Sequence, residues 1–388
     1  MAPKILAWFS TDDPNGFSYI WLDELCQSFA RIGYYCERVD IRETEAIRQL
    51  TDHASTNQYL FALGFQNAGL QLLRYDDLGI PYVNILLDTP YNPNNREIAA
   101  NVRMQLVLCM DDSDVAYLAA CHDHLKFVES MPLAGTRLHE EVLFPDKDIR
   151  ILFAGTNYNF HQRDWHGKIQ PQLAYAVDDA ADILLTDDRI SIVNAFDLAF
   201  RENKLELDAM AKKALYPAMH WIYCFIRSRQ RQKLVRTLAN VDIGVDVVGE
   251  GWENEPFAAQ LKIHGRKTYR ELLSLIARTR VMVNENGNLR SSVHERVFTG
   301  MLNGAVVLTD KSSYFDRHFV LGEDHFEYSW RQVDKVPDLI ISLLNREAKI
   351  IAVGNAAKSK AMQYHTWDAR ARHIVRRVQE VFSNSAAK

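Results

Sequence analysis

The pattern that most constrains the fold is a repeated alternation of short apolar runs with stretches that carry apolar residues at helical spacing. Runs such as 4–10, 60–65 and 82–87 are followed by polar residues. Between them, residues 19–32 place apolar side chains on one helical face, and Gly33 follows as a natural helix end. Strands that alternate with helices in this way are typical of a parallel sheet covered on both faces. The sequence therefore predicts a doubly wound α/β fold.

This alternation occurs twice, which indicates two domains. The chain has 388 residues, too many for one ordinary hydrophobic core. We place the boundary at the polar residues 146–148, before a new apolar strand at 149–154. The first domain, residues 1–148, then contains strands predicted at 4–10, 35–41, 60–65, 82–87, 105–110 and 126–129.

A long helical stretch interrupts the second series of strands. From about 160 to 240 the pattern is helical, with examples at 195–200 and 205–227. Alternation then resumes, with strands predicted at 245–248, 281–283 and 305–308 and helices at 269–278, 292–302, 336–345, 349–364 and 368–382. We interpret the stretch as a helical insertion in the second domain.

Composition excludes several classes of protein. A net charge of -5 argues against a generally cationic nucleic-acid binder. The five cysteines have irregular spacing without a CxxC pair, which favours reduced thiols and no zinc site. The N-terminal apolar run is short for a signal peptide, and no apolar run is long enough to span a bilayer. We expect a cytoplasmic protein without an integral membrane segment, for which peripheral membrane association stays open.

The segment from Asn284 to Asp310 reads as a strand, a polar loop, a helix and a second strand. Asn286 and its neighbour Gly287 tolerate tight turns. Ser291 or Ser292 is placed to cap the helix, whose free N–H groups and partial positive charge suit a diphosphate. Arg290 precedes the helix and is a candidate phosphate ligand, and we expect diphosphate contacts across Arg290, Ser291, Ser292, Val293 and His294.

Two residues of the predicted helix are candidate ligands on its surface. Glu295 and Thr299 are four residues apart and share one helix face. A carboxylate on the first turn suits the two hydroxyls of a ribose. The alternative is that Glu295 only favours the helix dipole, as an acid in a first turn does.

The run from His294 to Asp310, with Asn284 upstream, resembles the C-terminal signature of GT-B glycosyltransferases. It is most similar to the branch typified by the spore-maturation CgeB-like proteins. The segments 88–90, 153–159 and 365–375 agree with that branch. The resemblance covers the C-terminal half well and the N-terminal half loosely.

The resemblance implies two Rossmann-like domains that face each other across a cleft. The second, residues 149–365, would bind a nucleotide-sugar, and the first would bind the acceptor. The last helix, within 366–388, would pack back on the first domain. The further donor-binding residues proposed in the second domain, at strand ends and in the segment before helix 269–278, are Gly155, Thr156, Asn157, Gly249, Trp252, Lys267 and Tyr269. Trp252 is predicted to stack on a base or sugar, with core packing as the alternative.

One position departs from the family. Many retaining GT-B enzymes carry two glutamates about eight residues apart around this helix, and the second position is Thr299 here. Glu295 is therefore assigned to the ribose from helix geometry, and no stereochemical outcome is assigned.

The predicted catalytic residues are acids at strand ends in the first domain. Asp12 and Asp13 follow the first strand, and Asp88 follows another. An inverting transferase needs one base to take the proton of the acceptor hydroxyl. The alternative is that these acids only form turns and cap helices. His161 is a weaker candidate for leaving-group stabilisation.

We expect no metal and no cofactor other than the nucleotide-sugar co-substrate, with UDP as the expected nucleotide. No DxD motif of the GT-A kind is evident, and GT-B enzymes generally stabilise the leaving diphosphate with basic groups and helix dipoles. The acceptor, a protein, glycan or lipid-linked molecule, stays open. Two alternatives remain, namely a binding or scaffold subunit without activity and a nucleotide-sugar epimerase of the same fold.

Overall fold

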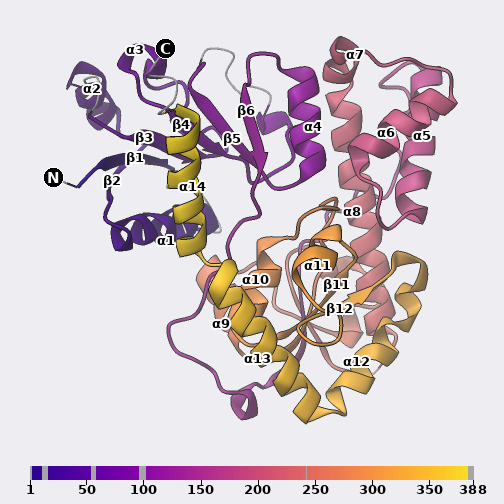
Figure 1. Cartoon of the computed structure of the whole chain (residues 1–388). Coiled ribbons are helices and arrows are strands. Elements are labelled where there is room, and N and C mark those ends of the chain that lie inside the picture. The colour runs from indigo at the N-terminus through magenta and orange to yellow at the C-terminus, as the bar shows by residue number, and fades with distance from the viewer. Residues whose placement is uncertain (1, 11–15, 54–57, 96–101, 242, 383–388) are drawn as a thin grey trace. The chain divides into compact units, whose positions relative to one another are not determined.

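The computed structural model describes residues 2–10, 16–53, 58–95, 102–241 and 243–382 (Figure 1). The chain forms two compact units. Unit 1 consists of Met1–Ala134 with His365–Lys388, and unit 2 consists of Gly135–Tyr364. The division thus falls at Ala134, earlier than residue 148, because the segment from Gly135 packs within unit 2. There Leu138 N donates to Asn303 Oδ1 at 2.8 Å.

Unit 1 contains a six-stranded parallel sheet in the order β2-β1-β3-β4-β5-β6. Strands β1 and β3 are neighbours in the sheet, and from these two strands the chain continues toward opposite edges of the sheet. This is a topological switch point, where open parallel sheets bind ligands at their carboxyl ends. The strands are β1 (Lys4–Phe9), β2 (Tyr35–Asp40), β3 (Phe61–Phe65), β4 (Tyr82–Ile85), β5 (Gln105–Cys109) and β6 (Phe127–Ser130).

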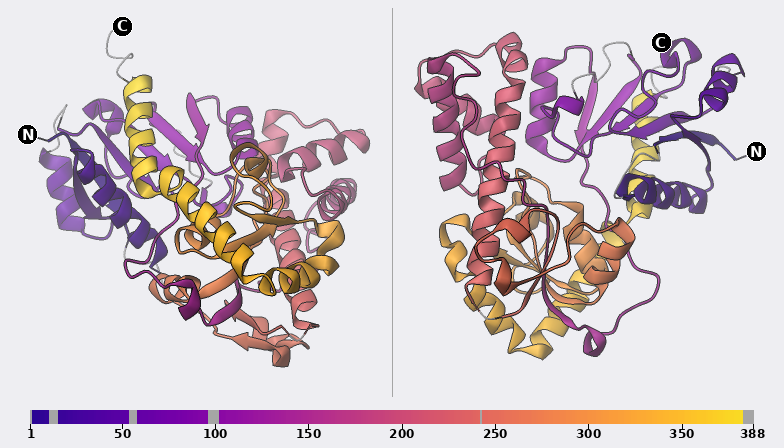
Figure 2. Two further views of the ribbon diagram at one scale, coloured as in Figure 1. Left: turned by 60° about the horizontal axis from the view of Figure 1, so that its bottom comes forward. Right: turned by 180° about the vertical axis from the view of Figure 1, so that it is seen from behind.

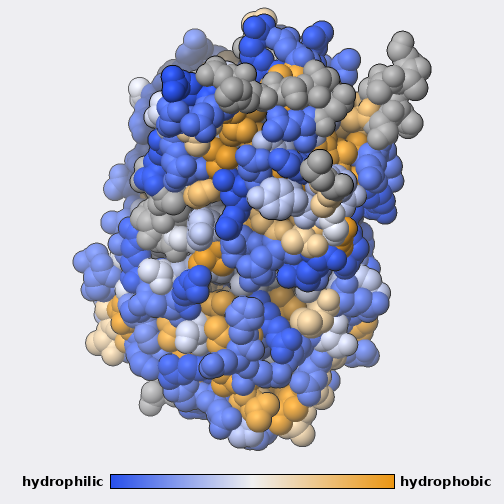
Figure 3. Space-filling model, turned by 90° about the vertical axis from the view of Figure 1, so that its left-hand side faces the viewer, coloured by the Kyte–Doolittle hydropathy of each residue, from blue (hydrophilic) through white to orange (hydrophobic). Residues whose placement is uncertain are grey.

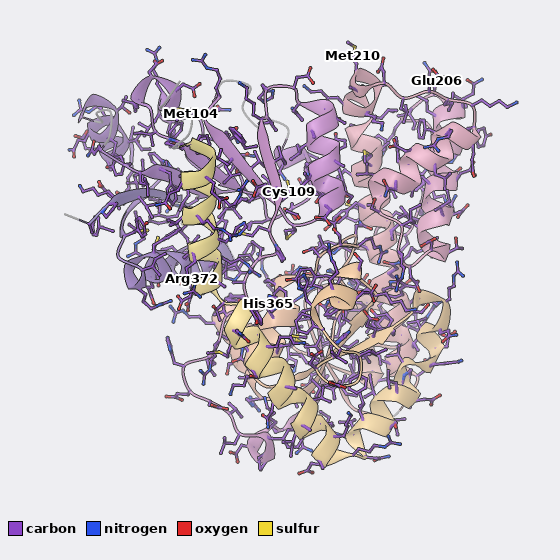
Figure 4. The ribbon with its side chains drawn as sticks, viewed as in Figure 1. Met104, Cys109, Glu206, Met210, His365 and Arg372 are labelled. Carbon is purple, nitrogen blue, oxygen red and sulfur yellow. The ribbon has the colours of Figure 1, made fainter. Side chains whose placement is uncertain are left out.

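Helices cover this sheet, and one of them comes from the end of the chain. The Trp367 ring of α14 lies 6.2 Å from that of Trp21 in α1, and Arg31 pairs with Asp368 at 2.6 Å. His365, labelled in Figure 4, marks the point where the chain re-enters unit 1. The helices of unit 1 are α1 (Phe17–Arg31), α2 (Thr44–His53), α3 (Tyr75–Leu78), α4 (Asp112–Cys121) and α14 (Trp367–Phe382).

Unit 2 contains a second six-stranded parallel sheet, in the order β12-β11-β10-β7-β8-β9. Its switch point lies between β7 and β10, which pair with each other. The strands are β7 (Ile149–Ala154), β8 (Val245–Val248), β9 (Leu261–Ile263), β10 (Thr279–Val283), β11 (Val306–Asp310) and β12 (Phe326–Tyr328).

Alternate residues of β7 face opposite layers of helices. Ile151 and Phe153 belong to the core cluster with Leu234 of α8. Leu152 instead packs in the cluster with Ile276 of α9. A strand buried on both faces reads as a continuous apolar run, which is why the sequence predicted it. The helices here are α9 (Tyr269–Ala277), α10 (Glu295–Leu302), α11 (Ser313–His318), α12 (Val336–Leu344) and α13 (Glu347–Tyr364).

The expected helical insertion follows β7. It consists of α5 (Pro171–Thr186), α6 (Ile192–Glu202), α7 (Ala209–Ala214) and α8 (Tyr216–Ala239). The single helix predicted over 205–227 is wrong, because the chain breaks at Leu215 and Pro217 restarts the helix in its first turn. Helix α8 runs from the insertion to the sheet of unit 2 (Figure 2). Met210, near the tip of the insertion, is 80% exposed (Figure 4).

The remaining elements are short. Strands β9 and β12 and helices α3 and α11 lack enough residues to show a periodicity, and the sequence did not predict them. Single turns of tighter helix occur at η1 (Pro93–Asn95), η2 (Phe144–Asp146), η3 (Trp252–Asn254), η4 (Ala258–Gln260) and η5 (Trp330–Lys335). Among the described helices, none is long and apolar enough to cross a membrane. Hydrophilic residues dominate the face drawn in Figure 3.

A substitution of Gly249, just after β8, tests how closely the backbone packs at the strand ends of unit 2. Its φ is 134°, and a Cβ there would lie 2.4 Å from the carbonyl oxygen of Gly155. We expect Gly249→Ala to lower the free energy of unfolding by about 2–4 kcal/mol, through strain and displaced backbone. Gly244→Ala is the matched control, since Gly244 has a φ of 68° but open space around it, and should cost about 1 kcal/mol. Thermal unfolding of both variants measures this, and equal losses would contradict the account.

Candidate anion-binding site in unit 2

Side chains from several elements meet at the carboxyl ends of β7, β10 and β11, beside the switch point. Arg296 of α10 donates from Nη1 to the carbonyl oxygen of Ala154, the last residue of β7. The backbone N–H of Asn284, after β10, donates to Leu308 O of β11 at 2.9 Å. The start of α10 is thereby fixed against β7, and the loop after β10 is fixed against β11.

Glu285 is the buried acid at the centre of this region. Its Oε2 accepts from Arg231 Nε at 2.7 Å and lies 3.9 Å from Arg227 Nε. Burial opposes the charged form of Glu285, but the charges of Arg231 and Arg227 outweigh it and hold its pKa below the usual range. Both arginines belong to α8, so the insertion contributes directly to the site.

A second buried pair lies nearby. Arg290 Nη1 is 3.4 Å from Asp310 Oδ2, which also accepts from Trp330 Nε1 at 3.2 Å. The other oxygen of Asp310 accepts from Asn286 N at 2.7 Å. Burial raises the pKa of Asp310 to about 6, although Arg290 opposes the shift, so the carboxyl is ionised at neutral pH.

Several guanidinium groups of this region keep hydrogen-bond donors that have no partner among the residues that the structure describes. These buried atoms are Nη2 of Arg231, Nε and Nη2 of Arg290, and Nε of Arg296. Burial without a partner is costly for such donors, so they favour an anionic ligand. With Arg227, four guanidinium groups face the three carboxylates of Glu285, Glu295 and Asp310. The cluster therefore carries one net positive charge, which favours the binding of an anion such as a diphosphate.

The start of α10 differs from the sequence prediction. The helix begins at Glu295 and its N-cap is His294, so the prediction of a Ser291 or Ser292 cap is wrong. The reason is that the carbonyl groups of these serines are held elsewhere. Ser292 O accepts from Ser312 Oγ at 2.7 Å, and Ser291 O accepts from Arg317 Nη2 at 2.7 Å. The loop therefore continues, with bends at 290–292, as far as His294 before the helix starts.

The two residues expected on one ligand-facing side of α10 have different surroundings. Glu295 is buried and its Oε2 contacts Nδ1 of His294. Thr299 is fully buried, and its Oγ1 accepts from the backbone N–H of Thr136 at 3.2 Å. Thr299 thus anchors the chain that enters unit 2. Val293 is also fully buried and packs in the α10 core cluster.

The turns after β7 and β8 are joined by backbone hydrogen bonds. Gly155 N donates to Val248 O at 2.8 Å, and Asn157 N donates to Glu250 O at 2.9 Å. The carbonyl oxygen of Thr156 accepts from Arg231 Nη1 at 2.9 Å. This turn therefore positions a guanidinium of the cluster.

Trp252 is a packing residue in this structure. Its indole is fully buried, lies 5.9 Å from the ring of Phe153 and donates from Nε1 to Gly155 O at 2.7 Å. A base has no exposed ring face to stack on, which corrects the stacking prediction. Tyr158 offers such a face instead, since it is 44% exposed and lies over both Arg227 and Arg231.

The segment before α9 lies at a different strand end. Lys267 Nζ is 3.8 Å from Glu271 of the same helix, and Tyr269, the first residue of α9, is buried. Thr268 caps α9 in a reciprocal pair with Glu271. These contacts explain the local fold, and ligand binding by Lys267 and Tyr269 stays a prediction.

The predicted catalytic acids belong to unit 1. Asp12 and Asp13 lie outside the described residues. Asp88 follows β4, and its Oδ2 accepts from Gln66 Nε2 at 3.4 Å. Its place at a strand's carboxyl end agrees with the expectation, and its catalytic role stays a prediction.

Sequence reasoning missed Arg227, Arg231 and Glu285. A usable signal was present, because Arg227 and Arg231 are four residues apart and share one helix face. Glu285 is the second residue after β10, at the strand end where ligand sites form. The weaker candidate His161 contacts Ser228 of α8 through Nδ1 at 3.2 Å, and burial lowers its pKa.

His294 gives the site a measurable pH dependence. Burial and the neighbouring charge of Arg296 lower the pKa of His294 from 6.5 to about 4, although Glu295 opposes the shift. The folded protein therefore keeps this ring neutral at pH values where the unfolded chain binds a proton. Its contribution to stability is complete above pH 6.5 and is lost as the pH falls toward 4. His294→Asn keeps a capping side chain and removes the titration.

We expect the free energy of unfolding of His294→Asn to rise by about 2 kcal/mol relative to that of the natural chain when the pH is lowered from 7.5 to 5. Urea unfolding of both proteins at the two pH values measures it. A difference that does not change with pH would show that the ring is not held neutral.

Residues 228–376 match the family model described as glycosyl transferase-like. No curated protein matches the chain. Three similar solved structures are HepE from Anabaena in complex with UDP-glucose, sucrose-phosphate synthase from Thermosynechococcus elongatus, and a glycosyltransferase from Rickettsia africae.

The similarity to these structures extends over nearly the whole chain at low identity. HepE has a TM-score of 0.56 at 11% identity, with 97% of this chain and 100% of that chain covered. The synthase has a TM-score of 0.54 at 11% identity, with 98% of this chain and 100% of that chain covered. The Rickettsia protein has a TM-score of 0.54 at 7% identity, with 99% of each chain covered. The CgeB-like branch stays a prediction. This chain has the two-domain Rossmann-like fold of GT-B glycosyltransferases, with a glycosyl transferase-like segment at 228–376.

Proposed function

We propose that the protein transfers a sugar from a nucleoside-diphosphate sugar to an acceptor hydroxyl, with unit 2 as the donor-binding domain. The observation that carries the proposal is the set of buried guanidinium groups with unpartnered donors at the switch point of unit 2. An anion with several oxygens satisfies such donors and takes up the excess positive charge. The glycosyl transferase-like family match over 228–376 includes Arg231, Arg290 and Arg296.

UDP is the proposed nucleotide. HepE, which shares the fold, was solved with UDP-glucose and with UDP. Glu295 is proposed to accept hydrogen bonds from the ribose, since its carboxylate lies at the first turn of α10 next to the guanidinium cluster. The exposed ring of Tyr158 covers the two arginines of α8 and is proposed to shield the phosphates from water.

The proposed chemistry depends on charge stabilisation of the leaving diphosphate. Departure of the sugar leaves a new negative charge on the UDP oxygen, and buried guanidinium groups stabilise it strongly because little water screens them. An acid of unit 1, Asp88 or one of Asp12 and Asp13, is proposed to take the acceptor proton. The proposed reaction needs no metal, and a cytoplasmic location fits the five free cysteines.

A substitution of Arg227 tests the donor site with little risk to the fold, because Arg231 still makes the closer contact to Glu285. We expect Arg227→Met to raise the Kd for UDP by about 10- to 100-fold, since one charge of the cluster is lost while the methylene stem is retained. Isothermal titration with UDP measures this. Arg229→Met is the matched control on the same helix, where Arg229 is exposed and lies over Phe225, and its Kd should not change.

Equal UDP affinity in the two variants would rule out α8 as part of the donor site. Release of UDP from UDP-sugars, with and without a cell extract as acceptor source, then separates the functions. Turnover that depends on the extract supports a transferase. Tight UDP binding without turnover indicates a scaffold subunit, and sugar conversion without an acceptor indicates an epimerase.

Removal of metal ions gives an independent test. We expect UDP release to be unchanged in excess EDTA, because the proposed leaving-group stabilisation comes from arginines. The measurement is the rate with EDTA against the rate with added Mg²⁺ or Mn²⁺. A rate that falls to background in EDTA and returns with the metal would contradict metal-independent catalysis.

A further inference from the structure

Two of the five cysteines come from neighbouring elements of unit 1. Cys26 lies in α1, and Cys36 lies in β2, which is an edge strand of the sheet. Helix α1 lies beside β2 (Figure 1), and Arg38 of β2 forms an ion pair with Asp23 of α1. This ion pair shows which side chains of the helix and the strand face each other.

The alternation of side chains along β2 turns Cys36 toward α1. Val39 packs with Leu6 in the core cluster on one face of the sheet. Successive side chains of a strand point to opposite faces, so Arg38 and Cys36, one and three residues earlier, point to the other face. The ion pair made by Arg38 identifies this face as the one that α1 covers. Cys36 therefore faces the helix.

The helix brings Cys26 to the same place. Asp23 and Cys26 are three residues apart and lie on one helix face. The chain leaves β1 at its carboxyl end and enters the parallel β2 at its amino end, so α1 runs opposite to both strands. Three helical residues advance about 4.5 Å, and two strand residues advance about 6.6 Å. One step beyond the ion pair, Cys26 thus comes opposite Cys36, and the two side chains are hydrogen-bond partners.

Cys36 is the more exposed of the two cysteines. Its side chain is half-buried, whereas Cys26 is buried. The hydrogen bond with Cys36, together with burial, raises the pKa of the Cys26 thiol, so Cys26 keeps its proton at neutral pH. A small oxidant from solvent therefore reaches Cys36 first, and Cys26 is held beside it as a second thiol.

We propose that Cys26 and Cys36 form a reversible disulfide when the protein meets a peroxide. The Cys36 thiolate attacks one oxygen of hydrogen peroxide, the O–O bond breaks, and the departing hydroxide takes up the proton that Cys36 released. The sulfur of Cys26 then attacks the Cys36 sulfenic acid, and the S–O bond breaks as the S–S bond forms. The Cys26 proton leaves with that oxygen as water. Two thiols and one peroxide thus give one disulfide and two waters.

The position of β2 at the sheet edge favours this reaction. A disulfide brings the two sulfurs to about 2.05 Å, closer than a hydrogen bond does, so the strand or the helix must shift slightly. An edge strand pairs with one neighbour, so β2 can move toward α1 without breaking a second ladder of hydrogen bonds. In a reducing compartment the disulfide is transient, because cellular thiols reduce it again.

Peptide mapping of the full-length chain tests the proposal. The chain is reduced, freed of reductant, treated with hydrogen peroxide, alkylated and digested with trypsin. Trypsin cuts after Arg31, between the two cysteines, and again after Arg38, so Cys26 and Cys36 fall in different peptides. We expect most chains to yield these two peptides joined, with a mass lower by two hydrogen atoms than the sum of the separate peptides. Dithiothreitol should separate them again.

Three variants assign the reaction to this pair. Cys36→Ser should abolish the joined peptides. Cys26→Ser should leave Cys36 as a sulfenic acid, which dimedone captures as a stable adduct. Cys224→Ser is the matched control, because Cys224 is also half-buried but lies in α8 of unit 2, and the joined peptides should form as in the natural chain. If a unit 1 variant does not fold, mapping of the natural chain decides alone.

The natural chain gives the outcomes that would overturn the proposal. These are the absence of the joined peptides, whether Cys36 stays reduced or proceeds to the sulfinic acid, and a disulfide of Cys36 with a cysteine other than Cys26. Joined peptides found only in chains that migrate as dimers on a non-reducing gel would also overturn it. None of these outcomes depends on UDP binding, so failure of the proposed donor site would leave this proposal standing.

Discussion

The buried ion pair between Glu285 and Arg231 is the interaction on which the rest of unit 2 depends. Glu285 follows β10, whereas Arg231 belongs to α8, and Arg231 also donates to Thr156 after β7. One guanidinium thus joins the insertion to both strands of the switch point. A buried carboxylate without this partner would be very costly. Arg231 Nη2 has no hydrogen-bond partner within the described ranges, so the residue that forms this structural ion pair also offers a donor to an anion.

Strand positions were predictable because burial on both faces leaves a clear mark in the sequence. The range 149–154 coincides with β7, and 245–248 coincides with β8. Short β9 was not predictable, because its three residues show no period. The insertion was visible as a helical stretch, but the break near Leu215 depends on a local proline and could not be placed from periodicity.

The candidate site was predicted in part, for reasons that follow from its contacts. The segment after β10 and the charge of Arg290 were found in the sequence, since strand–loop–helix patterns with a basic residue are visible locally. The pairing of Glu285 with Arg231 joins residues 54 positions apart, which no local pattern reveals. The cap at His294 depends on carbonyl contacts made by Ser312 and Arg317, again distant in sequence. Trp252 was predicted to stack on a ligand because it lies in a turn at a strand end, but its side chain is fully buried.

The central claim is that a diphosphate binds the guanidinium cluster at the switch point of unit 2. A crystal structure of the protein soaked with UDP tests it most directly. The account predicts diphosphate density within hydrogen-bond distance of at least two guanidinium groups among Arg227, Arg231, Arg290 and Arg296. Density for the diphosphate at another strand end, for example beside Lys267, with these four side chains unchanged, would contradict it.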